Sequence, residues 1–280
     1  MKWYIRSWKK ERSGSFSRFL DVYKAVIEYD ISISCGSESA IYASKFRGKK
    51  SIAFGDNDTA RQWIYGYFVD YVFSPDAIDR KQLEKQGLKD KLYLYPGYKE
   101  DIYIADFIPD PSFVSGLPFD NYVLVRPENI QANYLKNNRV KTITPDLLTL
   151  LEKRGYNVLF LPRYSFDKEY AIGLKRIFIP DKAIDGLNAC YYSNAVLTGA
   201  GTFAREAACL GVPSYSFYAG SELLAVDKKS INEGKMFFSR DVEELITKVL
   251  ISKKSFPDLT RSQLVRDNVV SKLISILNKL

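Results

Sequence analysis

The chain has 280 residues, 46% of them hydrophobic and 26% charged, so we expect a globular protein long enough for two domains and exclude wholesale disorder. Histidine is absent, which excludes histidine-based hydrolysis and histidine-ligated metal sites. The three cysteines have no paired spacing and the first residues show no signal-peptide pattern, so we expect a cytoplasmic protein without disulfides.

The net charge of +8 favours anionic partners. Basic residues are interspersed with acidic ones, and no motif of the common nucleic-acid readers occurs, so we expect phosphate-bearing ligands and no nucleic acid. No apolar run reaches the roughly 18 residues that a membrane-spanning helix needs.

Residues 1–29 differ from the rest of the chain. Apolar residues recur at helical spacing from Phe16 to Ile27, which predicts an amphipathic helix, and residues 3–10 before it are aromatic and basic. A helix that packs on the domain explains this pattern. The alternative is peripheral contact with the inner face of a membrane, where aromatic rings lie at headgroup depth and cations meet anionic lipids.

Four short apolar segments in the first half are typical of strands, and helical patterns begin near Ser39 and Thr59 between them. The predicted strands are residues 31–34, 51–54, 71–73 and 92–95. Alternating strands and helices predict a parallel sheet. The loop after the second strand contains Asp56 and Asp58, which are candidates for a catalytic base or for holding sugar hydroxyls, although helix capping also explains Asp58.

A stretch rich in Pro and Asp at 108–118 predicts a linker, and the alternation then begins again. The predicted strands are 122–125, 158–161, 176–179, 195–198, 214–217 and 236–238; the predicted helices include 144–155, with Thr144 as N-cap and Pro145 as its first residue, 241–253 and 259–280. We therefore predict an α/β protein with two Rossmann-like domains. The first, incomplete domain is 1–107, the second is 108–258, and helix 259–280 packs back on the first.

The strongest candidate site is a turn between a predicted strand and a predicted helix. Gly199 and Gly201 permit a tight turn and close approach of a ligand, and the helix start offers free amides and a positive dipole end to phosphate. Thr202 can cap the helix or donate to a phosphate, and Glu206, one turn later, can accept the hydroxyls of a ribose. A strand–helix turn without a ligand also explains the glycines, and the dinucleotide fingerprint is absent.

Three further residues are candidates for the same ligand. Arg126 and Arg163 each follow a predicted strand, and ligands of open parallel sheets bind beyond the carboxyl ends of the strands. The planar guanidinium suits a diphosphate, whereas a surface ion pair is the alternative for each arginine. Ser221 follows the next strand and is predicted to lie near the ligand, while we expect Asp227 to be structural.

Five segments, at residues 95–100, 105–112, 125–127, 180–187 and 199–208, together resemble a mainly archaeal family of proteins of unknown function. That family is similar to B-type glycosyltransferases and to UDP-N-acetylglucosamine 2-epimerases. The resemblance covers roughly residues 30–250 and implies a nucleotide-sugar donor. It implies Gly199, Gly201 and Thr202 at the diphosphate, Arg126 near the phosphates and Glu206 at the ribose. It implies no metal and no cofactor, because helix dipole and arginine take the place of the metal.

This sequence departs from the family pattern in two places. Family members begin with a strand and loop, followed by another strand–helix pair, that this chain lacks, so we expect an N-terminally shortened first domain on the acceptor side. Cys35 stands where members tend to carry histidine.

We expect a glycosyltransferase that moves a sugar from a nucleoside diphosphate to a glycan or lipid-linked acceptor. One alternative is a shortened relative that binds a nucleotide sugar without turnover, or that needs a complementing N-terminal subunit. The other is a nucleotide-sugar 2-epimerase, which the absence of histidine disfavours because epimerisation needs acid–base groups on both faces of the sugar.

Overall fold

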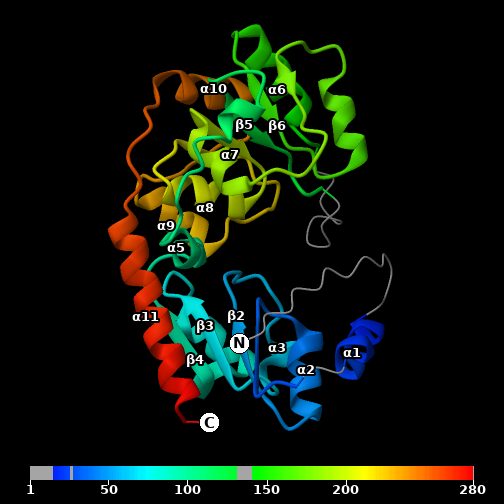
Figure 1. Cartoon of the computed structure of the whole chain (residues 1–280), viewed down its shortest axis with the longest axis vertical. Helices are drawn as coiled ribbons and strands as arrows, with labels where there is room; N and C mark the ends of the chain where they lie inside the picture. Colours follow the sequence, from blue (N-terminus) through cyan, green and yellow to red (C-terminus); the bar gives the residue numbers. More distant parts are fainter. Residues whose placement is uncertain (1–14, 26–27, 131–140, 280) are drawn as a thin grey trace. The chain divides into compact units, whose positions relative to one another are not determined.

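The computed structural model describes residues 15–25, 28–130 and 141–279. The chain divides into two compact units, residues 1–95 and 96–280, and each is built on one parallel sheet (Figure 1). The predicted α/β class is confirmed. The boundary between the units along the chain falls between Tyr95 and Pro96, whereas the predicted boundary is at 107. The difference arises because helix α5 (Lys99–Ile104) packs on helices α8 and α11 of the second unit.

The sheet of the first unit has the strand order β1-β2-β3-β4, and all four predicted strands are confirmed. Its elements are β1 (Ile31–Ser34), α2 (Glu38–Phe46), β2 (Lys50–Phe54), α3 (Trp63–Gly66), β3 (Tyr71–Pro75), α4 (Arg80–Leu83), the turns η1 (Glu84–Leu88) and η2 (Lys89–Lys91), and β4 (Leu92–Tyr95). The helix predicted near Thr59 begins only at Trp63. The Asn57 side chain accepts hydrogen bonds from the amide and hydroxyl of Thr59 and holds a turn there instead.

Helix α1 (Ser15–Lys24) is the described part of the predicted N-terminal helix. It packs on α2, where the ring centroid of Phe19 lies 5.6 Å from that of Phe46. The packing interpretation is therefore confirmed for this helix. The aromatic and basic segment at 3–10, on which the membrane interpretation rests, lies outside the described residues.

The second unit contains the six predicted strands in the order β10-β9-β8-β5-β6-β7, all parallel. They are β5 (Val123–Arg126), β6 (Val158–Phe160), β7 (Ile177–Phe178), β8 (Ala195–Thr198), β9 (Ser214–Ser216) and β10 (Phe237–Phe238). The helical elements are η3 (Val114–Gly116), α6 (Thr144–Lys153), η4 (Ser165–Ala171), α7 (Gly186–Tyr192), α8 (Gly201–Cys209), α9 (Ala225–Asn232), α10 (Val242–Ile251) and α11 (Leu259–Leu277).

A hydrophobic core of this unit lies between the sheet and helices α6 and α10. Val123 and Val125 of β5 are buried in this core, whereas Leu124 between them is buried outside it, as the alternation of side chains along a strand requires. Helices α7 and α8 pack on each other, and α8 packs on β8 and β9. The central strands are thus covered on both faces, which explains their continuous apolar sequences.

The start of α6 differs from the prediction by one residue. The N-cap is Ile143, so Thr144 is the first helical residue. Isoleucine has no side-chain acceptor, and Glu128 performs the capping role: its carboxylate accepts hydrogen bonds from the amide of Ile143 and the hydroxyl of Thr144. Arg240 donates to the same carboxylate over 3.2 Å.

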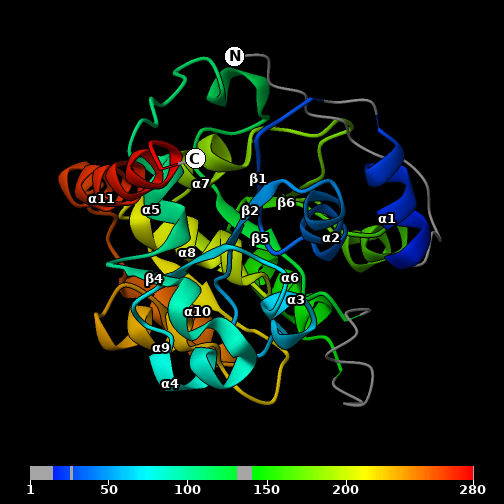
Figure 2. The ribbon, with the colours of Figure 1, turned by 90° about the horizontal axis from the view of Figure 1, so that it is seen from below.

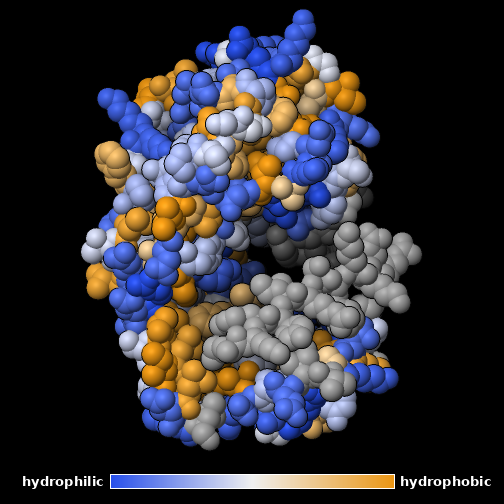
Figure 3. Space-filling model, in the orientation of Figure 1, coloured by the Kyte–Doolittle hydropathy of each residue, from blue (hydrophilic) through white to orange (hydrophobic). Residues whose placement is uncertain are grey.

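Figures 1 and 2 both show α5 between α11 and α8, in agreement with its packing on the two helices. Hydrophobic side chains gather on the surface where α11 runs (Figure 3), and Leu264, Val270 and Ile274 of this helix are exposed. The predicted packing of α11 on the first unit stays a prediction.

Among the described helices, none is both long and apolar enough to cross a membrane.

Buried charges join α5, α8 and α9. Arg205 of α8 donates from Nε to Glu100 of α5 over 3.0 Å and from Nη1 to Asp227 of α9 over 2.7 Å. The three side chains are almost fully buried, with 4%, 1% and 1% of their surface exposed. Each charge is therefore compensated in a place where an isolated charge is unstable.

We predict that Arg205→Ala lowers the free energy of unfolding by about 3–5 kcal/mol, because it removes the arginine that pairs with two buried carboxylates. Urea titration measures this change. Arg154→Ala is the matched control, since Arg154 pairs with Glu243 at the surface over 3.4 Å, and its loss is expected to cost at most about 1 kcal/mol. Equal losses in the two variants would contradict the structural role of the buried cluster.

Candidate functional site

The predicted glycine turn lies where the order of the strands reverses. From β5 the chain continues to β6 and β7 on one side of the sheet, and from β8 it continues to β9 and β10 on the other. The last residues of these two central strands, Arg126 and Thr198, are partners in the register of the sheet. In open parallel sheets, ligands bind at such a reversal, beyond the carboxyl ends of the strands.

The structure begins α8 at Gly201, one residue earlier than predicted, with Ala200 as N-cap. The hydroxyl of Thr198 accepts a hydrogen bond from the amide of Ala200 over 2.9 Å and shapes the turn. Thr202 therefore does not cap the helix, because it already lies inside it; its side chain is exposed. Since alanine offers no side-chain acceptor, the first amides of α8 have no partner from the cap and can bind an anion.

Close packing explains both glycines. A Cβ atom on Gly199 would lie 2.5 Å from the Cα of Glu128, and one on Gly201 would lie 2.8 Å from Nη1 of Arg205. Neither glycine has a left-handed backbone. The backbone of Glu128 thus excludes a Cβ at position 199 with or without a ligand, and at position 201 a Cβ would have to displace the Arg205 guanidinium. The glycine pattern alone therefore does not establish a binding site.

Arg126 is the residue that the fold does not explain. Its guanidinium carbon lies 4.6 Å from the ring centroid of Phe203, the third residue of α8. Within residues 15–25, 28–130 and 141–279, it forms no ion pair, and its buried Nε has no hydrogen-bond partner. Burial lowers the pKa of Arg126, and the charge of Arg163 lowers that pKa further. Arg163 itself donates from Nε to the carbonyl of Pro127 over 3.3 Å.

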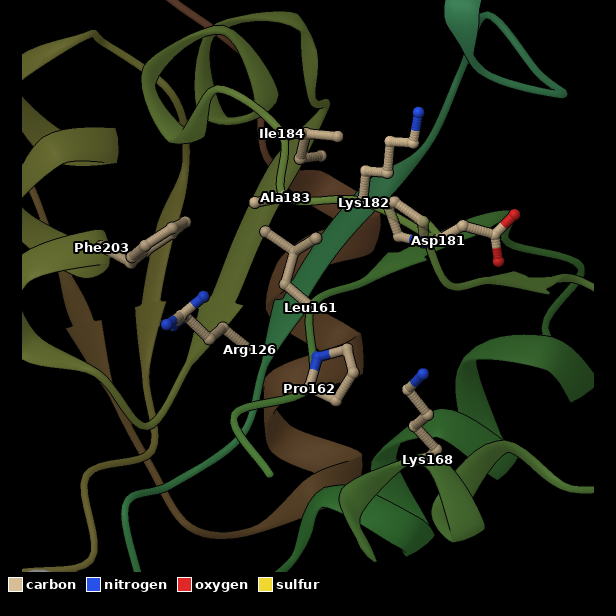
Figure 4. A pocket seen from close by; sticks show the side chains of 10 residues that line it. Arg126, Leu161, Pro162, Lys168, Asp181, Lys182, Ala183, Ile184 and Phe203 are labelled. Atoms are coloured by element: carbon tan, nitrogen blue, oxygen red, sulfur yellow. The ribbon is translucent and has the colours of Figure 1, made fainter. Parts of the chain in front are cut away.

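A hollow of about 330 Å³ adjoins Arg126. Figure 4 shows the Arg126 side chain directed toward Phe203, with Leu161 and Pro162 between Arg126 and a charged rim. The lining residues are Arg126, Leu161, Pro162, Lys168, Pro180, Asp181, Lys182, Ala183, Ile184 and Phe203. The hollow thus combines apolar walls with three cations and one carboxylate, that of Asp181. Apolar walls with a few charged groups suit a ligand that has both a ring and an anionic group.

Glu206 of α8 is half-buried and accepts a hydrogen bond from the hydroxyl of Tyr103 over 2.7 Å. Burial raises the pKa of Glu206, and the charge of Glu100 raises it as well. The hydrogen bond from Tyr103 and the charges of Arg205 and Arg126 lower it. The mutual effect of Arg126 and Glu206 on their pKa values shows that the two groups belong to one electrostatic environment.

The other predicted residues are more dispersed. Ser221 is exposed in the loop between β9 and α9, and in the described chain no hydrogen bond joins it to the turn. Asp227 is buried and paired with Arg205, which confirms its structural role. Asp56 and Asp58 are half-buried in the loop after β2 and belong to the first unit. The structure thus gathers Arg126, Arg163, Glu206 and the turn 199–202 in the second unit.

Sequence reasoning missed Tyr103 and Phe203 as members of this region. Tyr103 is 103 residues from Glu206 along the chain, and no local pattern marks it. Phe203 is part of the recognised segment, but its stacking with Arg126 depends on the pairing of β5 with β8. Across the described ranges, no group of three or more metal-ligating side chains is arranged to hold an ion.

A family model described as "Protein of unknown function (DUF354)" matches residues 54–274. The chain belongs to this family. The uncharacterized protein MJ0665 of Methanocaldococcus jannaschii is 33% identical over 135 residues, which are 48% of this chain and 38% of that protein. The match therefore spans well under half the length of this relative. The predicted resemblance to an archaeal family of unknown function is confirmed.

Solved structures share the fold over nearly the whole chain. The UDP-GlcNAc 2-epimerase of M. jannaschii in complex with UDP-GlcNAc and UDP is 15% identical, with 93% of this chain and 80% of that chain covered and a TM-score of 0.67. The UDP-GlcNAc 2-epimerase of Neisseria meningitidis is 10% identical, with 93% and 81% covered and a TM-score of 0.70. The glycotransferase of kitacinnamycin is 10% identical, with 93% and 81% covered and a TM-score of 0.52. These likenesses confirm the predicted B-type architecture of two Rossmann-like domains.

We predict that Gly199→Ala lowers the free energy of unfolding by about 1–3 kcal/mol, because the new methyl group overlaps the backbone of Glu128. Gly116→Ala is the control, since a Cβ there meets nothing within 4 Å. Urea titration of both variants without ligand separates packing from binding. A Gly199→Ala variant as stable as the wild type would show that the turn is not closely packed.

Proposed function

We propose that the second unit binds a nucleoside-diphosphate sugar and that the protein transfers the sugar to a glycan or lipid-linked acceptor. The observation that carries the proposal is the half-buried guanidinium of Arg126, which forms no ion pair within the described residues and stands beside the uncapped start of α8. A half-buried cation without an ion-pair partner is costly, and a ligand diphosphate supplies that partner.

The proposed donor site uses three kinds of group. The amides at the start of α8, the hydroxyl of Thr202 and the guanidinium groups of Arg126 and Arg163 bind the diphosphate. They also stabilise the negative charge that develops on the diphosphate when the bond to the sugar breaks. The carboxylate of Glu206 accepts ribose hydroxyls, and Ser221 contacts the donor from the neighbouring loop. The apolar walls of the adjoining hollow fit a nucleobase.

Chemistry at the sugar needs a proton acceptor, and in a chain without histidine a carboxylate is the natural choice. We propose Asp56 or Asp58 of the first unit as the base that takes the proton of the acceptor hydroxyl.

We also propose that residues 1–29 contact an anionic membrane, which would bring the protein to a lipid-linked acceptor. Co-sedimentation with anionic and neutral vesicles tests this contact.

A 2-epimerase is the second candidate, because similar solved structures include enzymes named UDP-GlcNAc 2-epimerase. The two reactions differ in the bond that breaks. Transfer breaks the bond between the anomeric carbon and the diphosphate and leaves the C2–H bond intact, whereas inversion at C2 breaks the C2–H bond.

We predict that Arg126→Ala weakens UDP binding about 10- to 100-fold in calorimetric titration, since it removes charge-assisted hydrogen bonds to the diphosphate. Arg154→Ala, at a surface ion pair of the same unit, is the matched control and is expected to keep wild-type affinity. The proposed donor site is wrong if the folded wild-type protein binds no nucleoside diphosphate, or if both variants lose the same affinity.

We predict that the protein releases UDP from UDP-GlcNAc in D2O without incorporating deuterium at C2, as mass spectrometry and NMR can measure. Asp56→Asn or Asp58→Asn is expected to slow this release about 100-fold or more without changing UDP affinity. Asp90→Asn, at an exposed position, is the control. Deuterium at C2 would support the epimerase instead, and binding without any turnover would support a non-catalytic or partner-dependent protein.

A further inference from the structure

Tyr103 reaches Glu206 from a helix that is firmly held. Within α5, Glu100 pairs with the buried Arg205 over 3.0 Å. The next residue, Asp101, accepts hydrogen bonds from the amide of Tyr98 and the hydroxyl of Ser262, each over 2.8 Å. Both carboxylates are buried, with 0% and 1% of their residue surface exposed. Tyr103, one turn later, is therefore placed by fixed backbone rather than by a mobile loop.

The hydrogen bond from Tyr103 uses only part of the carboxylate. An ionised glutamate has two oxygens with about four acceptor positions, and the Tyr103 hydroxyl occupies one of them on Oε1. In the described chain no residue donates a hydrogen bond to Oε2. The neighbouring Arg205 is directed to Glu100 and Asp227 and does not pair with Glu206. The Glu206 carboxylate is thus held through Oε1, and Oε2 can accept a hydrogen bond from a ligand.

We propose that Tyr103 is a positioning residue for Glu206, holding its carboxylate so that the second oxygen accepts a ribose hydroxyl of the bound nucleotide. This inference rests on the proposed nucleotide site. It assigns to the pair a preference for nucleotides that keep this ribose hydroxyl over analogues that lack it, because a fixed acceptor left without its hydroxyl partner stays unsatisfied in a half-buried place.

The hydrogen bond also supports the ionised form of Glu206. Glu100 on α5 faces Glu206 with like charge, while Arg205 on α8 and Arg126 after β5 face it with opposite charge. The thiol of Cys190 on α7 is also within its electrostatic reach. The hydrogen bond from Tyr103 lowers the pKa of Glu206 against the effect of burial. Its removal therefore raises the pKa, so Glu206 becomes protonated at a higher pH.

A thermodynamic cycle tests the inference. The affinities of UDP, 2′-deoxy-UDP and 3′-deoxy-UDP are measured by calorimetry for the wild type, Tyr103→Phe and Glu206→Gln. In the wild type we expect loss of the recognised hydroxyl to weaken binding about 10-fold or more. In both variants we expect weaker UDP binding and a smaller penalty for the missing hydroxyl. Tyr98→Phe, which removes a hydroxyl bonded to Glu233 over 3.1 Å, is the matched control and should keep the wild-type penalty.

The outcomes separate this inference from the proposed function. If UDP does not bind the wild type, both are overturned. If UDP binds but the hydroxyl penalty is the same in the wild type and in Tyr103→Phe, only the role of Tyr103 is overturned, and a general loss of packing explains any weaker binding. Thermal unfolding of each variant confirms that it is folded before titration.

The pH dependence of UDP-GlcNAc binding gives a second measurement that a structural role would not change. The diphosphate of this ligand does not titrate near neutral pH, so the profile reports on the protein. Binding is expected to weaken as the pH falls through the pKa of Glu206, and the midpoint should move to higher pH in Tyr103→Phe. This pH dependence of binding should disappear in Glu206→Gln. An unchanged midpoint in Tyr103→Phe would overturn the inference.

Discussion

The second unit depends on the charge of Arg205, enclosed between carboxylates from two other helices. Arg205 joins α8 to Glu100 of α5 and to Asp227 of α9, and all three groups are removed from water. Such a cluster contributes little net stability compared with apolar packing of the same volume, but loss of one member is costly. The pair of Arg205 with Glu100 joins α5 to α8, the two helices that carry Tyr103 and Glu206.

Two arginines show how the same side chain serves structure and binding. Arg205 is buried and has two carboxylate partners, so it completes the fold. Arg126 is half-buried, stacks on Phe203 and, among the described residues, forms no ion pair. Glu206 acts on its charge without pairing with it, and the lack of a directly paired carboxylate is the physical reason to expect an anionic ligand. Glu128 is a buried acid whose partners are all structural. Its carboxylate pairs with Arg240 and accepts hydrogen bonds from the residues at the start of α6.

The ten strands of the described residues and their parallel arrangement could be predicted from the sequence, because short apolar segments separated by polar turns leave few other solutions. Errors occurred where a side chain distant in sequence decided a local boundary. Glu128 moved the cap of α6, and Asn57 replaced the first turn of a helix. The sequence predicts a boundary at 107, whereas the chain divides into compact units between Tyr95 and Pro96, because nothing near α5 indicates that Glu100 pairs with a residue 105 positions away.

The sequence by itself determined the α/β class, the family and the segment that forms the turn, since these depend on periodicity and on local residue types. Only the tertiary structure decided the meaning of single residues in that segment. It showed that Gly199 packs closely on the backbone of Glu128 and Gly201 on the side chain of Arg205, that Arg205 is structural, and that Glu206 has a partner in Tyr103. The reason is physical: a charge or a missing Cβ acquires its role from the atoms within a few ångströms of it, and most of these belong to distant parts of the chain.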